Sequence, residues 1–251
     1  LPLPAQIAWQ YSLEEAKIIA QAEGKLIVAD FWAPWCGPCK DMDSRVWSEV
    51  EVQLMLQNFV PAKINIDQNR TATRRYNIQE IPDVFILDAY GDELHRRTGF
   101  TDKTGIMKLL DLFAVRTSAI NKALARLLEN EKNAYAACGV GEQYQSAAVK
   151  LPQGSGRSVF LARSEDFLKK SLKLVNPDKD TVLEEKLQLL FALNEILNGH
   201  SKKGIRTIEE KYALENVQVA NYSLACFALA IGYRETGSND NFRARRYIAK
   251  Y

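Results

Sequence analysis

Cys36 and Cys39 are separated only by Gly37 and Pro38, which places two thiols about one helical turn apart. The apolar run over residues 26–32 predicts a buried strand before them, after which the chain turns into a helix. Cys36 therefore falls at a helix N-terminus, where unpaired backbone N–H groups and the helix dipole favour a thiolate. Because only a thiolate attacks a disulfide, this pattern predicts a redox-active dithiol.

A pair of cysteines with this spacing can also be half of a zinc site, which needs further cysteine or histidine ligands at short spacing. The other cysteines are Cys138 and Cys226, and the two histidines are His95 and His200, all distant in sequence from the pair. We therefore expect no metal ion and no cofactor other than a Cys36–Cys39 disulfide. Cys138 and Cys226 are expected to be buried thiols, and a bridge between them is the alternative in an oxidising compartment.

The composition narrows the class of protein. The 251 residues are 47% hydrophobic and 25% charged, which is typical of a globular protein. The formal net charge of +2 gives no bulk field that attracts nucleic acid or acidic membranes. No apolar run approaches the roughly 20 residues that a transmembrane helix needs. We expect neither a nucleic-acid partner nor a membrane span.

Hydrophobic spacing in the first half of the chain predicts a mixed α/β arrangement. A capping box from Ser12 to Glu15 begins a helix that Gly24 ends. A second capping box, Ser48 to Glu51, begins a helix that reaches Phe59. The predicted strands are 26–32, 60–66, 84–87 and 93–97, and the other predicted helices are the one after the dithiol, 71–76 and 106–113. This order predicts a mixed sheet with helices on both faces.

From about Val115 onward the pattern predicts helices only. Residues 140–144 and 231–233 resemble the first helix of tetratricopeptide repeats, but no fixed period of about 34 residues is visible. A generic helical bundle is the alternative. We expect two domains, an α/β domain at 1–116 and an all-α domain at 117–251.

The segment at residues 31–40, Phe-Trp-Ala-Pro-Trp-Cys-Gly-Pro-Cys-Lys, resembles the active-site segment of thioredoxins. The other matching landmarks are a buried acid, the next long strand, a cis-proline step and the glycine after the last strand, at Asp30, residues 62–69, Ile81-Pro82 and Gly99. The resemblance covers roughly residues 25–113. It implies a thioredoxin fold and protein thiol–disulfide oxidoreductase activity.

The resemblance also implies catalytic roles. Cys36, exposed at the helix start, is expected to attack the substrate disulfide, and the more buried Cys39 to resolve the mixed disulfide. Asp30 is expected beneath the pair, where burial raises its pKa and lets it exchange a proton with Cys39. Lys63 on the neighbouring strand is expected to tune the pKa of Asp30. An ordinary buried ion pair is the alternative for these two residues.

A substrate-binding surface is implied around the dithiol. Trp35 is expected to shield the thiols, and Gly37 and Pro38 form the turn between them, where Pro38 withholds an N–H from Cys36. A cis bond before Pro82 is expected to leave the backbone of Ile81 free to pair with an extended substrate segment.

The helix after the dithiol departs from the thioredoxin pattern, because residues 41–47 lack the usual proline. This segment looks more like exported thioredoxin-like domains, including the C-terminal domain of the transmembrane thiol reductant conductor. Asp41 and Asp43 are expected either to raise the pKa of Cys36 or to complement the helix N-terminus. The first residue, Leu1, together with this resemblance favours a periplasmic or otherwise exported protein, with the cytoplasm as the alternative.

The sequence therefore predicts a protein disulfide reductase that works by dithiol exchange. Its expected partners are proteins that bear disulfides and an upstream thiol reductant. The alternative is a binding scaffold or chaperone-like adaptor whose helical domain selects partners, with redox activity secondary.

Overall fold

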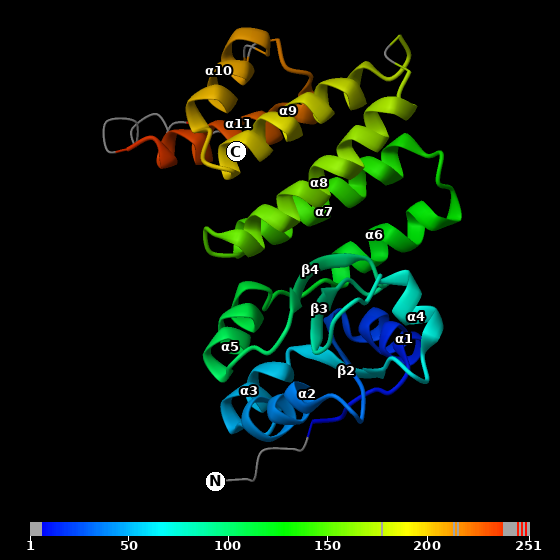
Figure 1. Cartoon of the computed structure of the whole chain (residues 1–251). Helices are drawn as coiled ribbons and strands as arrows, with labels where there is room; N and C mark the ends of the chain where they lie inside the picture. Colours follow the sequence, from blue (N-terminus) through cyan, green and yellow to red (C-terminus); the bar gives the residue numbers. More distant parts are fainter. Residues whose placement is uncertain are drawn as a thin grey trace. The chain divides into compact units, whose positions relative to one another are not determined.

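The computed structural model describes residues 7–176, 178–212, 214, 216–237, 245, 247 and 249. The chain divides into two compact units (Figure 1). The first unit comprises Leu1–Asn121 and Lys150–Val159, and the second comprises Lys122–Val149 and Phe160–Tyr251. The domain limits expected from the sequence, 1–116 and 117–251, stay a prediction.

Four strands of the first unit form one mixed sheet in the order β2-β1-β3-β4 (Figure 1). The strand β1 (Leu26–Trp32) pairs in parallel with β2 (Phe59–Asn65) and antiparallel with β3 (Asp83–Leu87). The edge strand β4 (Glu93–Thr98) pairs antiparallel with β3. The mixed sheet and its flanking helices confirm the predicted fold class of the first half.

The helix α1 (Leu13–Glu23) begins and ends where the sequence predicts. The Ser12 hydroxyl accepts a hydrogen bond from the Glu15 N–H at 3.4 Å, and Gly24 adopts the left-handed conformation with φ of 63°. The later helices of this unit are α2 (Gly37–Met42), the π-helical η1 (Asp43–Trp47), α3 (Val50–Leu56), α4 (Arg70–Arg75) and α5 (Lys103–Leu112), followed by the first turn of α6 (Ser118–Glu129).

The central strand β1 is buried on both faces, which its nearly continuous apolar sequence requires. Successive side chains of a strand point to opposite faces of the sheet. Ile27, Ala29 and Phe31 therefore share one face, where they join the apolar cluster that includes side chains of α1. Asp30 points to the other face, where it contacts Trp47 of η1.

The predicted capping box at Ser48 is wrong. The chain passes from α2 into the wider π-helical turn η1, and α3 then begins after Glu49 without any side-chain cap. The Ser48 hydroxyl instead donates to the Ser44 carbonyl at 2.7 Å. The insertion of η1 shifts the helical register, so Val46 and Trp47 become buried.

The described part of the second unit contains helices and no strand, as the sequence predicts. Its helices, after the rest of α6, are α7 (Ala134–Lys150) without its last residue, α8 (Ser155–Leu174) from Phe160 onward, α9 (Thr181–Leu197), α10 (Ser201–Lys211) and α11 (Val219–Glu235). A buried polar chain crosses its apolar core, in which Gln145 donates to the Asn194 side chain at 2.7 Å and Asn194 donates to Ser164 at 3.2 Å. The tetratricopeptide-like organisation stays a prediction.

Cys138 and Cys226 both lie buried in this second unit, as expected. Burial raises the pKa of the Cys138 thiol to about 12, so at neutral pH this sulfur is protonated and a poor nucleophile.

The end of α1 gives a test of the fold. A Cβ at Gly24 lies 1.9 Å from the Ser118 hydroxyl oxygen, and φ is +63°, so Gly24→Ala adds a clash to a strained backbone. We expect it to lower the free energy of unfolding by about 3 kcal/mol or more. The measurement is urea unfolding followed by tryptophan fluorescence, because all four tryptophans lie in the first unit.

The matched control is Gly99→Ala, which has φ of +86° but no atom within 4 Å of the added Cβ. It should cost only the left-handed backbone penalty of about 1–2 kcal/mol. Equal losses in the two variants would show that the contact between Gly24 and Ser118 is not tight.

Candidate active site

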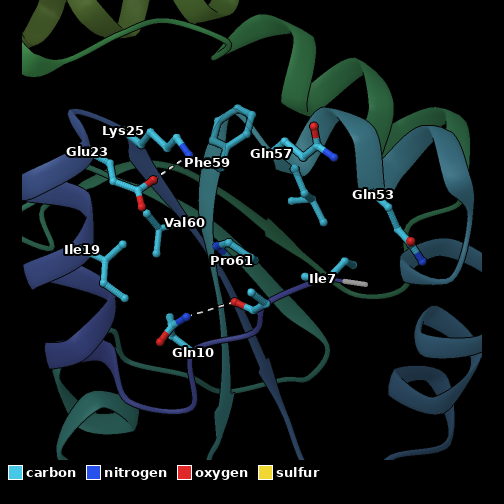
Figure 2. A pocket seen from close by; sticks show the side chains of 12 residues that line it. Ile7, Gln10, Ile19, Glu23, Lys25, Gln53, Gln57, Phe59, Val60 and Pro61 are labelled. Carbon is cyan, nitrogen blue, oxygen red and sulfur yellow. Dashed lines mark hydrogen bonds and ion pairs between the residues drawn. The ribbon is translucent and has the colours of Figure 1, made fainter. Parts of the chain in front are cut away.

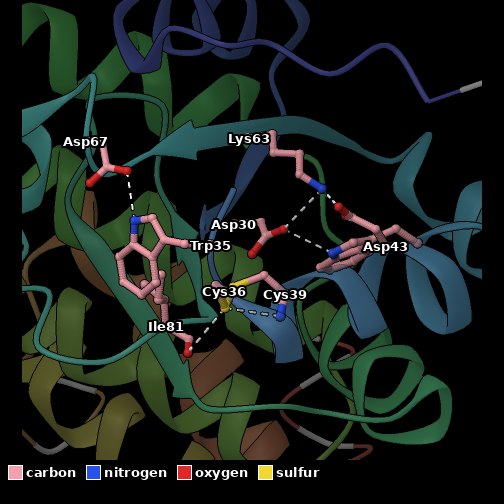
Figure 3. The surroundings of a disulfide bond; sticks show 9 residues. Asp30, Trp35, Cys36, Cys39, Asp43, Lys63, Asp67 and Ile81 are labelled. Atoms are coloured by element: carbon pink, nitrogen blue, oxygen red, sulfur yellow. Dashed lines mark hydrogen bonds and ion pairs between the residues drawn. A yellow bond between two sulfur atoms is a disulfide. The ribbon is translucent and has the colours of Figure 1, made fainter. Parts of the chain in front are cut away.

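Cys36 and Cys39 form a disulfide where β1 leads into α2 (Figure 3). Cys36 is the N-cap residue of α2, and the Cys39 backbone N–H donates to its sulfur at 3.1 Å. The expected exposure of Cys36 is wrong for this disulfide form, since its exposed fraction is 4% against 2% for Cys39. The two sulfurs therefore differ in their hydrogen bonding and position in the helix rather than in burial.

An exposed rim surrounds the disulfide. Trp35 is 66% exposed, and its indole Nε1–H donates to Asp67 Oδ2 at 2.9 Å, which fixes the ring beside Cys36 (Figure 3). Gly37 and Pro38 are also exposed. A partner can thus touch the turn that carries Cys36 without opening the core.

The bond between Ile81 and Pro82 is cis, as expected. The carbonyl oxygen of Ile81 lies 3.7 Å from the Cys36 sulfur, a position in which it can accept a hydrogen bond from the reduced thiol (Figure 3). The Gly99 N–H donates to the Pro82 carbonyl at 2.8 Å, which ties this loop to the end of β4. The structure therefore brings Ile81 and Cys36 together from segments 45 residues apart.

Asp30 is a buried carboxylate with an exposed fraction of 1%. Its Oδ2 accepts a hydrogen bond from Trp47 Nε1–H at 3.0 Å, while its Oδ1 has no partner within the described part of the chain. Burial raises the pKa of Asp30 to about 7, an effect that Lys63 opposes and the nearby Asp43 reinforces. The expected perturbation of this acid is present, and loss of hydration is its main cause.

Lys63 lies between two carboxylates. The parallel register sets it opposite Asp30, and its Nζ is 3.8 Å from Asp30 Oδ2 (Figure 3). Its closer ion pair is with Asp43. The ammonium also lies 5.4 Å from the ring centroid of Trp9 and 5.1 Å from that of Trp32, within cation–π range.

Asp43 thus has a role that neither sequence interpretation included. It pairs with Lys63 rather than serving as a free charge near the helix N-terminus. Two further residues of the site were not predicted from the sequence: Trp47, whose Nε1–H donates to Asp30, and Trp9, whose ring packs edge-on against Trp47 with 5.5 Å between the centroids. The available signal was the presence of four tryptophans within the first 47 residues, but no sequence pattern marks the π-helical register that turns Trp47 inward.

A separate hollow lies beside the edge strand β2 (Figure 2). Its wall is apolar at Ile19, Phe59 and Val60, and the ion pair between Lys25 and Glu23, at 2.6 Å, stands at its rim. None of the site residues predicted from the sequence lines it.

Across the ranges that the structure describes, no three histidine, cysteine or acidic side chains are grouped as a metal site requires. None of the helices in those ranges combines the length and apolar character needed to cross a membrane.

Comparison with known proteins identifies the family. The thioredoxin family model matches residues 12–112. Thioredoxin of Bacillus subtilis (strain 168) is 34% identical over 92 residues, which are 37% of this chain and 86% of the relative. The thiol:disulfide interchange protein DsbD of Yersinia pestis (strain Pestoides F) is 29% identical over 111 residues, which are 42% of this chain but only 18% of DsbD. The solution structure of a thioredoxin from Thermus thermophilus, 27% identical, superposes with a TM-score of 0.39 over 42% of this chain and 85% of that one.

The chain therefore belongs to the thioredoxin family, because it is 34% identical to a thioredoxin of which it covers 86%. Members of this family are thiol–disulfide oxidoreductases, and this chain carries the redox disulfide at Cys36 and Cys39. The resemblance inferred from the sequence is confirmed for its first half.

The raised pKa of Asp30 predicts how stability depends on pH. The pKa is higher in the folded protein, about 7, than the ordinary value of 3.8. The carboxyl group's contribution to stability is therefore complete below pH 3.8 and is lost as the pH rises through about 7. Asp30→Asn keeps the hydrogen-bond acceptor for Trp47 but has no ionisable group, so it removes this loss. A rise of about three pKa units corresponds to a difference in stability of at most about 4 kcal/mol.

We expect oxidised Asp30→Asn to be more stable than wild type at pH 8 and nearly equal to it at pH 4, by urea unfolding with tryptophan fluorescence. Asp41→Asn, an exposed aspartate on α2, is the matched control and should show no such trend. A gain for Asp30→Asn that is the same at both pH values would contradict a raised pKa.

Proposed function

We propose that this protein reduces disulfide bonds in other proteins through the Cys36–Cys39 pair. The observation that carries the proposal is the hydrogen bond from the Cys39 N–H to the Cys36 sulfur, at 3.1 Å, in a turn whose neighbouring residues are exposed. A backbone N–H directed at this sulfur stabilises a thiolate there once the disulfide is reduced.

The first step of the proposed reaction uses Cys36. In the reduced protein the Cys36 thiolate attacks one sulfur of the substrate disulfide. A bond forms between Cys36 and that sulfur, the substrate disulfide breaks, and the other substrate sulfur leaves as a thiolate.

The second step uses Cys39 and Asp30. The Cys39 thiol must lose a proton before it attacks the Cys36 sulfur, and the ionised Asp30 carboxylate accepts that proton. A pKa of about 7 suits this transfer, because the group is then available in both states near neutral pH. The attack re-forms the Cys36–Cys39 bond and releases the second substrate thiolate.

Lys63 has a positioning role in this scheme. Its ammonium, 3.8 Å from Asp30, stabilises the ionised carboxylate, while its ion pair with Asp43 limits that effect. Two carboxylates thus share one lysine, which supports a pKa of Asp30 that remains near neutrality rather than falling to an ordinary acidic value.

The proposed substrate surface consists of Trp35, Gly37, Pro38, Ile81 and Pro82. Trp35, Gly37 and Pro38 are exposed beside the disulfide, and the Ile81 carbonyl lies 3.7 Å from the Cys36 sulfur. An extended substrate segment that pairs with the Ile81 backbone brings its own disulfide close to Cys36.

The reducing direction follows from the turn between the cysteines. Pro38 has no N–H, so it supplies no donor to the Cys36 sulfur. The reduced state is therefore less favoured than in a turn with more donors, and a dithiol whose reduced state is less favoured is the better reductant.

Proteins with accessible disulfides are the substrates, and an upstream thiol reductant restores the dithiol after each cycle. We place this work in the periplasm or another exported compartment, supported by the likeness of this region to part of DsbD; the cytoplasm is the alternative.

Loss of the attacking sulfur tests the activity. Cys36→Ser should reduce insulin no faster than dithiothreitol alone, because no thiolate remains at the helix start. The readout is turbidity from the freed insulin chain. Cys138→Ala, which removes a buried sulfur of the second unit, should keep wild-type activity. Background-level turbidity with the wild-type protein would contradict the proposed reductase.

Loss of the resolving sulfur tests the order of the two cysteines. Cys39→Ser should accumulate a mixed disulfide between Cys36 and an insulin chain, visible as a band on a non-reducing gel that disappears with reductant. The double variant Cys36→Ser with Cys39→Ser is the control and should give no such band. Trapping by Cys36→Ser instead of Cys39→Ser would reverse the assigned roles.

A further inference from the structure

The loop at residues 78–82 joins α4 to β3 and presents Ile81 to the Cys36 sulfur. The described contacts of Arg96, on the edge strand β4, reach both ends of this loop. The single side chain of Arg96 therefore links the two ends of the loop that presents Ile81 to the dithiol.

At the far end of the loop, Arg96 holds Asp83. The Asp83 side chain is fully buried, and Arg96 Nε–H donates to its two oxygens at 3.2 and 3.0 Å. Arg96 Nη2–H donates to Asp83 Oδ2 at 2.5 Å, and the Thr98 hydroxyl donates to Oδ1 at 3.0 Å. Such a two-pronged guanidinium–carboxylate pair fixes orientation as well as distance. Asp83 directly follows Pro82, so the pair fixes the chain next to the dithiol.

At the near end, Arg96 holds the end of α4. Its Nη1–H donates to the Tyr76 carbonyl at 3.4 Å and its Nη2–H to the Asn77 carbonyl at 3.3 Å. Tyr76 is the C-cap of α4, where carbonyls lack partners within the helix. The guanidinium group also lies 4.9 Å from the ring centroid of Phe85, which limits its movement.

We propose that Arg96 and Asp83 form a positioning pair that clamps the loop at residues 78–82 and so sets how tightly an extended segment of a protein disulfide binds beside Cys36. The inference rests on the proposed function and adds to it a determinant of protein-substrate binding. Lysine cannot replace Arg96, because a single ammonium cannot form the fork to Asp83 and also reach the carbonyls of Tyr76 and Asn77.

The test compares a protein disulfide with a small one that has no peptide segment to pair with Ile81. Reduced protein reacts in single turnover with insulin or with bis(2-hydroxyethyl) disulfide, and alkylation counts the remaining thiols. For Arg96→Lys we expect the half-saturating insulin concentration to rise about tenfold. The limiting rate with insulin and the rate with the small disulfide should not change.

Arg97→Lys is the matched control, because this neighbouring arginine donates to the Thr101 hydroxyl, at 2.9 Å, instead of to Asp83. Asp83→Asn keeps the shape of the buried side chain but removes its charge, and it should give the same split as Arg96→Lys. It also serves as the test if Arg96→Lys does not fold. Faster hydrogen exchange of the Gly99 amide, whose partner is the Pro82 carbonyl, is the structural readout.

The outcomes separate the two proposals. The inference is overturned if folded Arg96→Lys and Asp83→Asn bind insulin as tightly as wild type. It is also overturned if both variants lose reactivity equally with insulin and with the small disulfide, which indicates general damage to the fold. A wild-type protein that reacts with the small disulfide but not with insulin contradicts the proposed function, and the inference falls with it.

Discussion

The constraint that organises the candidate active site is the burial of the Asp30 carboxyl group, which the central strand β1 carries into the first unit. A buried charge is unfavourable unless partners compensate for the lost water. Here Trp47 donates one hydrogen bond to Asp30, and Lys63 lies nearby with a positive charge. Lys63 also forms an ion pair with Asp43, so its charge compensates Asp30 only in part. Because these partners do not fully replace the lost hydration, the pKa of Asp30 is raised to about 7. The raised pKa lowers the stability of the fold above neutral pH. The same raised pKa suits Asp30 to the proton transfer in the proposed reaction.

Three elements must agree for this arrangement to exist. The alternation of β1 sends Asp30 to the face away from α1, and the parallel register with β2 places Lys63 opposite it. The π-helical turn η1 then directs Trp47 inward and brings Asp43 to the lysine. A change of register in any of the three would separate the acid from its partners. The dithiol itself needs less, since its sulfurs are set by one short helix and the loop that carries Ile81.

Features encoded within a few neighbouring residues were predicted well. The spacing of Cys36 and Cys39, the caps of α1 at Ser12 and Gly24, and the strands follow from local chemistry and hydrophobic periodicity. The prediction failed at Ser48, where a plausible capping sequence lies in a chain that a π-helical turn had already shifted. It failed also for the exposure of Cys36, because neighbouring segments cover that residue in the folded disulfide form.

The sequence by itself therefore determined the reactive pair, the fold class of the first half and the family to which it belongs. Only the tertiary structure decided which polar groups meet: Asp43 with Lys63, Trp47 with Asp30, and Arg96 with Asp83. The physical reason is that these contacts join segments 13 to 20 residues apart through sheet pairing and a local change of helical register. Hydrophobic periodicity records which face of an element is buried, but it does not record which polar groups meet there.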